Sequence, residues 1–145
     1  YPVVDPNSEE AKEILNTGEK ELLTQYGLRT LARGEDGFTE KYDGDMVKRD
    51  MSYHQGVIWP WLLGQYYDTL KNMIKYSKNN KEKKALEDKL EKFRINVKNT
   101  FWNEMTRGRT VGNISEIYSV DNEKYIAEGT FAQAWSIAEI FRIIV

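Results

Sequence analysis

Apolar side chains recur at helical spacing along residues 59–77, in the most aromatic part of the chain. Spacings of three and four residues place such side chains on one face of a helix. Pro60 suits the first turn of that helix, where a missing N–H removes no intrahelical hydrogen bond. The pattern therefore predicts a helix that begins near Trp59 and ends near Ser77, before a turn at Asn79-Asn80. Its stripe comprises Ile58, Trp61, Leu62, Gln65, Tyr66, Thr69 and Met73.

Three further segments predict helices. The first begins at Asp5-Pro6, with Asp5 as N-cap and Pro6 in the first turn, and its apolar face holds Ala11, Ile14, Leu15, Leu22 and Leu23. The second covers residues 81–101, with apolar positions at Leu86, Leu90, Phe93, Val97 and Phe101. The last begins near Gly129-Thr130 and is expected to bury Phe131, Ala134, Trp135, Ala138 and Phe141.

Periodicity is lost over residues 25–51 and 102–128, where glycine, asparagine and aspartate indicate turns. Aromatic residues such as Tyr26, Phe38 and Tyr42 favour an ordered, packed loop in the first of these segments. Within the second, residues 113–118 alternate between polar and apolar and are compatible with a locally extended backbone. The sequence therefore predicts an all-α chain of four helices, arranged as helical hairpins with long functional loops at one end.

Composition narrows the class of protein. The length of 145 residues suits one domain, and 40% hydrophobic with 30% charged residues is typical of a soluble globular chain. A net charge of −2 gives no electrostatic reason to expect nucleic acid or an anionic membrane as partner. The absence of cysteine excludes disulfides and thiolate metal sites and is compatible with the cytoplasm. Because the sequence starts at Tyr1 without methionine, we expect it to be a piece of a longer protein.

Aromatic residues and carboxylates supply the candidate chemistry. Four tryptophans and nine tyrosines offer flat apolar surfaces with polar edges, on which sugars stack. The polar run Tyr53-His54-Gln55, ended by Gly56, could present side chains from a loop; the alternative is the lead-in to a core helix. Glycoside hydrolysis uses two carboxylates, and the aromatic-rich loops contain Asp43, Asp45, Asp50, Glu116, Asp121 and Glu128. Each of these also has ordinary roles as a cap, turn former or ion-pair partner.

Several motifs resemble one known family. They are Gly27-Leu28-Arg29-Thr30-Leu31, Arg49-Asp50, Tyr53-His54-Gln55-Gly56, Trp59-Pro60-Trp61-Leu62-Leu63-Gly64, Asn113-Ile114-Ser115-Glu116 and the segment 132–139. In this order they resemble the C-terminal catalytic domain of glycogen debranching enzymes, which carries amylo-α-1,6-glucosidase activity. The resemblance covers nearly the whole chain and implies part of an (α/α)6 toroid. It implies a glucan substrate such as glycogen or limit dextrin, and no metal or organic cofactor.

The resemblance also implies roles for individual residues. Glu116 would be the general base in an inverting hydrolysis of the α-1,6-linked glucose at a branch stub. Trp59 and Trp61 would wall the glucose pocket, and Tyr53, His54 and Gln55 would donate or accept hydrogen bonds at sugar hydroxyls. Arg29 and Asp50 would either line the site or pair with each other. Gln133 and Trp135 are expected to be structural.

Departures from the family pattern set limits. The aspartate that serves as general acid is expected upstream and has no counterpart here, so we expect this chain alone to be inactive. Four helices would form about a third of the toroid, leaving apolar faces for the rest of the parent chain or for self-association. Residues 119–128 lack a run rich in proline and glycine. The alternatives are another toroid glycosidase, of the glucoamylase, trehalase or oligosaccharide glucosidase type, and a non-catalytic carbohydrate-binding or protein-interaction module.

Overall fold

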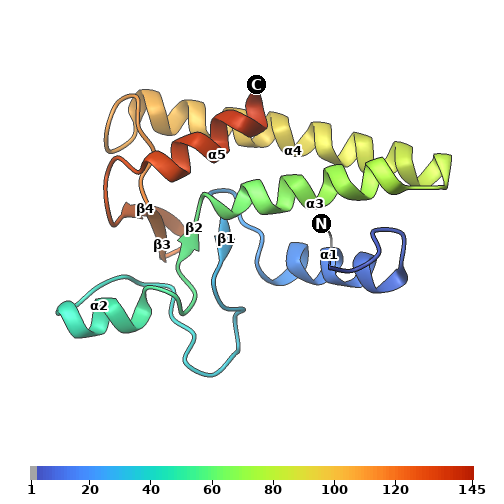
Figure 1. Cartoon of the computed structure of the whole chain (residues 1–145). Coiled ribbons are helices and arrows are strands. Elements are labelled where there is room, and N and C mark those ends of the chain that lie inside the picture. Colours follow the sequence, from blue (N-terminus) through green and yellow to red (C-terminus); the bar gives the residue numbers. More distant parts are fainter. Residues whose placement is uncertain (1–2) are drawn as a thin grey trace.

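The computed structural model describes residues 3–145, of which about half are helical. Along the chain the elements are α1 (Glu9–Glu21), β1 (Leu28–Arg29), α2 (Met46–Ser52), β2 (Ile58–Trp59), α3 (Leu62–Tyr76), α4 (Asn80–Arg107), β3 (Ile117–Asp121), β4 (Lys124–Glu128) and α5 (Ala134–Ile144). Helices α3, α4 and α5 pack on one another, and α1 lies beside α3 (Figure 1). The sheet and α2 lie together at the end of the helical layer where α3 and α5 begin (Figure 1).

Two apolar clusters hold the helices together. The larger lies between α3, α4 and α5 and comprises Leu63, Val97, Phe101, Ile114, Ile140 and Ile143. The smaller joins α1 to α3 through Leu15, Tyr66, Leu70 and Met73. Burial of such side chains is the main favourable term in folding. The predicted apolar face of residues 81–101 is confirmed, because Val97 and Phe101 are buried and Phe93 packs against both clusters.

The prediction of an all-α chain was wrong, because the structure contains a four-stranded antiparallel sheet in the order β1-β2-β3-β4. Its edges come from the two segments that we predicted to be irregular. Leu28 pairs with Trp59 and Ile58 with Tyr118, so the sheet joins residues about thirty and sixty positions apart in the sequence. Strands of two residues carry too little alternation to be recognised in a sequence, and β1 and β2 exist only through these partners.

The helix boundaries also differ from the predicted ones. Helix α1 begins at Glu9, because Ser8 rather than Asp5 is its N-cap and accepts a hydrogen bond from the Ala11 N–H at 3.1 Å. Helix α3 begins at Leu62 because the two residues before Pro60 are in strand β2. Helix α4 continues to Arg107, six residues beyond the predicted end. Helix α5 begins at Ala134, because residues 130–133 pair with residues 114–116 instead of coiling.

Helix α2 was missed because it has almost no buried face. Met46, Val47 and Met51 are 70%, 63% and 71% exposed. The apolar residues of α2 therefore do not form a stripe that packs on the core, and the sequence shows no helical periodicity there. A local signal was present, since Asp45 is the N-cap and accepts a hydrogen bond from the Lys48 N–H at 2.9 Å. The prediction of buried side chains in the last helix was wrong for all five residues: Phe131, Trp135 and Phe141 are 56%, 51% and 48% exposed, and Ala134 and Ala138 are exposed as well. The buried residues of α5 are Ser136, Ile140 and Ile143.

In the described range 3–145, none of the helices has the length and apolar character needed to cross a membrane.

Asn122 and Glu123 form the two-residue loop between β3 and β4, and both have positive φ, at 48° and 64°. Such a loop favours asparagine followed by glycine, and a left-handed conformation is strained at a glutamate. We expect Glu123→Gly to raise the free energy of unfolding by about 0.5–1 kcal/mol, measured by urea titration. Glu123→Ala removes the same charge without relieving the strain and should give no such gain. A gain from both variants would assign the effect to charge instead.

Candidate functional site

Two helices begin at the end of the molecule where the sheet lies. Trp61 is the N-cap of α3 and Gln133 the N-cap of α5. The first turns of both helices lie next to β2, β3 and β4 (Figure 1). Glu116, the predicted catalytic carboxylate, immediately precedes β3. The fold thus brings the Trp59-Pro60-Trp61 and Gln133-Ala134-Trp135 motifs to the same end of the helical layer as Glu116.

The carboxylate of Glu116 accepts hydrogen bonds at both oxygens. The Thr130 backbone N–H donates to Oε2 and the Gln133 side-chain amide donates to Oε1, each at 3.0 Å. The backbone is also paired, since the Glu116 N–H donates to the Thr130 carbonyl at 2.8 Å. Gly129 is at φ 64°, and a Cβ there would lie 2.6 Å from Oε2 of Glu116. A side chain at position 129 is therefore incompatible with the observed place of the carboxylate.

Tyr53 lies against the same carboxylate. Burial raises the pKa of the Tyr53 phenol well above its ordinary value, and a hydrogen bond with Glu116 and the charge of Glu116 raise it further. The phenol therefore stays protonated at neutral pH and acts as a donor. The predicted site residues Tyr53 and Glu116, 63 positions apart in sequence numbering, are brought close enough for the charge of Glu116 to raise the pKa of Tyr53.

Tyr53, His54 and Trp59 form one aromatic cluster. The His54 ring stacks on Trp59 with centroids 5.2 Å apart and an angle of 8° between planes, and Tyr53 meets Trp59 edge-on at 4.7 Å. The Trp59 Nε1–H donates to the Tyr53 carbonyl at 3.1 Å. Trp59 is only 6% exposed, whereas His54 is exposed. Trp59 is thus a buried support of this cluster, and His54 is its accessible member.

Trp61 and Trp135 form a second aromatic pair. Their rings are stacked with centroids 4.0 Å apart and 19° between planes. Trp61 packs against Val57, Trp59 and Ile117, while Trp135 is 51% exposed. An indole with half its surface in solvent offers a flat apolar surface of the kind on which sugars stack. Trp135 therefore presents a stacking surface that the sequence did not indicate.

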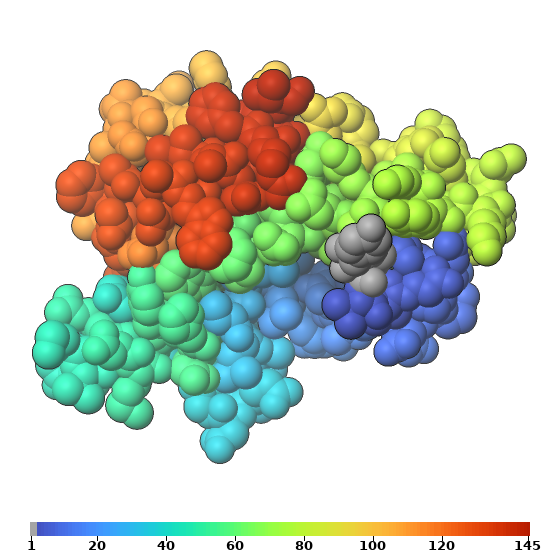
Figure 2. Space-filling view, in the orientation of Figure 1, coloured from blue at the N-terminus to red at the C-terminus, as the bar shows by residue number. Residues whose placement is uncertain are grey.

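A hollow of about 760 Å³ adjoins Glu116. Its wall combines carboxylates, guanidinium groups and aromatic rings, from Glu116, Glu128, Arg49, Arg109, Tyr42 and Phe131. Glu128 accepts a hydrogen bond from the Ser119 hydroxyl, and the Arg109 guanidinium lies 5.9 Å from the centre of the Phe131 ring. In Figure 2 the teal α2 segment lies below the orange and red segments of the chain. Arg49 of α2 and residues 126–131, at and after the end of β4, both line the hollow.

The other predicted polar residues line a different hollow. A depression of about 770 Å³ is lined by Asp50, His54 and Gln55 together with charged residues of the 36–48 loop. The structure thus places Glu116 beside one depression and Asp50, His54 and Gln55 beside another. Tyr42, which lines the first depression, contacts Tyr53, with ring centres 5.6 Å apart.

Arg29 lines neither hollow. It is 7% exposed, its Nη1 lies 3.1 Å from Oε1 of Glu40, and its guanidinium lies 5.9 Å from the centre of the Phe38 ring. Burial lowers the pKa of Arg29, and the Glu40 charge opposes that shift. Arg29 thus pairs with Glu40 and not with Asp50, which is exposed beside the second hollow.

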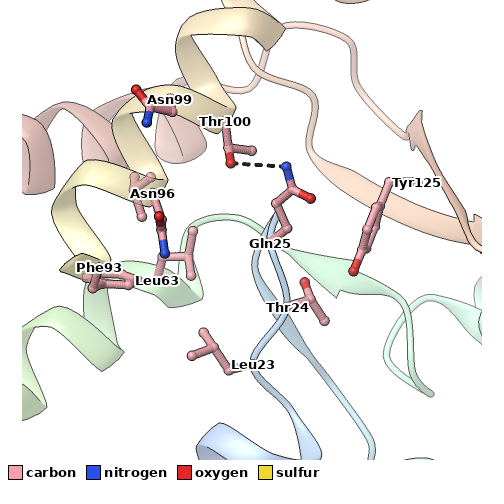
Figure 3. Close-up of a pocket in the computed structure, with 10 residues that line it drawn as sticks. Leu23, Thr24, Gln25, Leu63, Phe93, Asn96, Asn99, Thr100 and Tyr125 are labelled. Carbon is pink, nitrogen blue, oxygen red and sulfur yellow. Dashed lines mark hydrogen bonds between the residues drawn. The ribbon is translucent and has the colours of Figure 1, made fainter. Parts of the chain in front are cut away.

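A third hollow, of about 670 Å³, lies between α4 and the segment 23–25 and contains none of the predicted site residues. Figure 3 shows its uncharged lining, in which the Gln25 amide reaches the Thr100 hydroxyl at 3.3 Å. Among the described residues, no group of three or more metal-ligating side chains is present.

Sequence reasoning missed three contributors to the Glu116 site: Gly129, Thr130 and Gln133. Thr130 acts through its backbone N–H, which leaves no trace in the residue type. Gln133 was taken as structural because it was expected to lie on the last helix, among large residues predicted to be buried. Its place at the N-cap of α5 became apparent only in the structure, so the sequence held no signal for its role.

Gly129→Ala should displace the Glu116 carboxylate and strain the backbone. A left-handed alanine costs roughly 1–2 kcal/mol, and its methyl group would overlap Oε2 of Glu116. We expect a larger loss than that in urea unfolding, because the overlap with Glu116 adds to the backbone strain. Gly34→Ala is the matched control, since Gly34 also has positive φ but nothing lies within 4 Å of its would-be Cβ. Equal losses in both variants would show that contact with Glu116 adds nothing.

Comparison with known proteins supplies the family. A family model described as amylo-alpha-1,6-glucosidase matches residues 2–142. A comparison with curated proteins gave no significant match. The family match spans the aromatic cluster, Glu116 and the start of α5, and so covers every residue of the site described above. The chain belongs to the amylo-α-1,6-glucosidase family.

Proposed function

We propose that this chain is the C-terminal part of a glycogen-debranching α-1,6-glucosidase, and that Glu116 is its general base. The parent protein would hydrolyse α-1,6 branch points of glycogen or limit dextrin with inversion. In the proposed step Glu116 takes a proton from a water molecule while the oxygen of that water bonds to the anomeric carbon. The bond from that carbon to the leaving oxygen breaks, and the leaving oxygen receives a proton from a second carboxyl group.

One observation supports Glu116 most directly: its carboxylate is held by neutral donors beside a hollow. In the described part of the chain Glu116 has no salt bridge, whereas Glu19, Glu40, Asp68 and Glu139 are each paired with a lysine or arginine. A carboxylate oriented by amide groups keeps its charge available for a proton. This combination of fixed orientation, partial exposure and no counter-ion suits a base better than a structural carboxylate.

The general acid is proposed to come from upstream residues of the parent protein. Inverting hydrolysis places the two carboxyl groups roughly 6.5–9.5 Å apart, with the attacking water between them. We propose that the helices α3, α4 and α5 are consecutive members of an (α/α)6 toroid, an arrangement supported by the short α3–α4 connection and by their mutual packing. The exposed apolar residues Ile14, Phe141 and Val145 would then be covered by the rest of the parent chain.

Substrate contacts are proposed for the residues around Glu116. Tyr53, beside Glu116, and His54, in the neighbouring hollow, would bond sugar hydroxyls, and Trp61 with Trp135 would stack on a sugar ring. Trp59 would support these groups from beneath, in keeping with its burial. Gln55 and Asp50 line the neighbouring hollow and would contact a more distant part of the glucan. Arg29 would act only by fixing Glu40 in the loop. No cofactor enters the proposal, and the cytoplasm is the proposed location.

The decisive experiment is glucose release from a phosphorylase limit dextrin by the full-length parent protein. Replacing the base by its amide in Glu116→Gln should lower the rate roughly 10²–10⁴-fold. Glu10→Gln, an exposed glutamate of α1, is the matched control and should retain the wild-type rate. An active Glu116→Gln variant would overturn the assignment. A wild type that ignores limit dextrin but cleaves another glucoside would point to a different toroid glycosidase.

The isolated chain of 145 residues should release no glucose from limit dextrin, because one of its two required carboxyl groups is proposed to lie upstream. Its exposed apolar residues should also promote association. Glucose assay and sedimentation velocity on the purified chain test both expectations. Turnover at the rate of the parent protein would show that the general acid is contained in this chain.

A further inference from the structure

Gln133 occupies the N-cap position of α5 but does not cap it. Its backbone is extended, at φ −99° and ψ 111°, and its side chain accepts no hydrogen bond from the first turn of the helix. Serine, threonine, aspartate and asparagine are the residues that stabilise a helix start. The amide group of Gln133 instead donates to Oε1 of Glu116 at 3.0 Å. Helix α5 therefore has no side-chain cap, and the side chain at the N-cap position binds the Glu116 carboxylate instead.

Backbone hydrogen bonds hold Gln133 next to Glu116. The Gln133 N–H donates to the Ile114 carbonyl at 2.9 Å, and the Glu116 N–H donates to the Thr130 carbonyl at 2.8 Å. These two bonds pair residues 114–116 with residues 130–133. Gln133 is also the first residue of the helical turn that follows, since its carbonyl accepts from the Ile137 N–H at 3.1 Å. The backbone that carries the Gln133 side chain is thus fixed by three hydrogen bonds, two at Gln133 itself and one between Glu116 and Thr130.

We infer that Gln133 is a positioning residue that holds the carboxylate of Glu116 through its amide N–H, an inference that rests on the proposed role of Glu116 as base. A carboxylate carries about four acceptor sites on its two oxygens. Gln133 occupies a site on Oε1 and Thr130 a site on Oε2, which stops rotation of the group about its last bond. The sites left over are available to Tyr53 and to a water molecule. Both donors are neutral amides, so neither forms an ion pair with the carboxylate.

The test uses two variants of the full-length parent protein, assayed for glucose release from limit dextrin. Gln133→Ser introduces a preferred N-cap residue that is too short to reach Glu116, so α5 should be as stable as in the wild type or more so. Gln133→Met keeps the length of the side chain and removes the donor. We expect kcat to fall roughly 10–100-fold in both variants, as for loss of a hydrogen bond to a charged group. KM should change less than about twofold, because the substrate contacts remain.

Gln65→Met is the matched control, since Gln65 is exposed on α3 and is not one of the donors to the Glu116 carboxylate, and its kcat should equal that of the wild type. A Gln133→Ser variant with wild-type kcat, measured beside an inactive Glu116→Gln, would overturn the inference and leave the proposed function intact. A fully active Glu116→Gln would instead overturn the proposed function. A fall in kcat in Gln133→Ser that is matched by a lower melting temperature would identify Gln133 as a structural tie and overturn the positioning role.

Discussion

The pairing of Ile58 with Tyr118 is the contact on which the site depends. This pairing joins β2, the short strand that contains Trp59, to β3, the strand that follows Glu116. Without it, Tyr53 and Trp59 would have no fixed relation to a carboxylate about sixty residues away. Both paired residues are almost fully buried, so their hydrogen bonds are protected from water and a slip in register would expose apolar surface.

Charged groups are used in two different ways in the molecule. Arg142 joins α5 to α3, because its guanidinium donates to Asp68, to Glu139 and to the Gly64 carbonyl. Hydrogen bonds to the two carboxylates raise the pKa of Arg142, so its charge is permanent. Glu116 differs, since its two hydrogen-bond donors are neutral and no salt bridge to it is formed in the described part of the chain, although Arg49 and Arg109 line the same hollow. Ion pairs therefore secure helix packing, while the candidate site contains a carboxylate oriented by neutral donors.

Helix packing was largely predictable because its cause is local. Spacings of three and four residues along 81–101 directed Val97 and Phe101 inward, and the structure places both in the core. The sequence motifs were also sufficient to indicate the family, since residue types in order carry that information directly. The start of α3 was misjudged by three residues, because periodicity does not show that Ile58 and Trp59 are held by other strands.

The sequence by itself determined the four long helices, the apolar face of α4 and the family motifs, because each depends on side chains close together along the chain. Only the tertiary structure decided the sheet and the surroundings of Glu116. Strands as short as β1 and β2 are stabilised by partners distant in sequence, and no local pattern specifies those partners. The donor from Thr130 is a backbone group and that from Gln133 depends on register, so neither is visible in residue type. Hydrogen bonds across long sequence separations are a property of the folded chain.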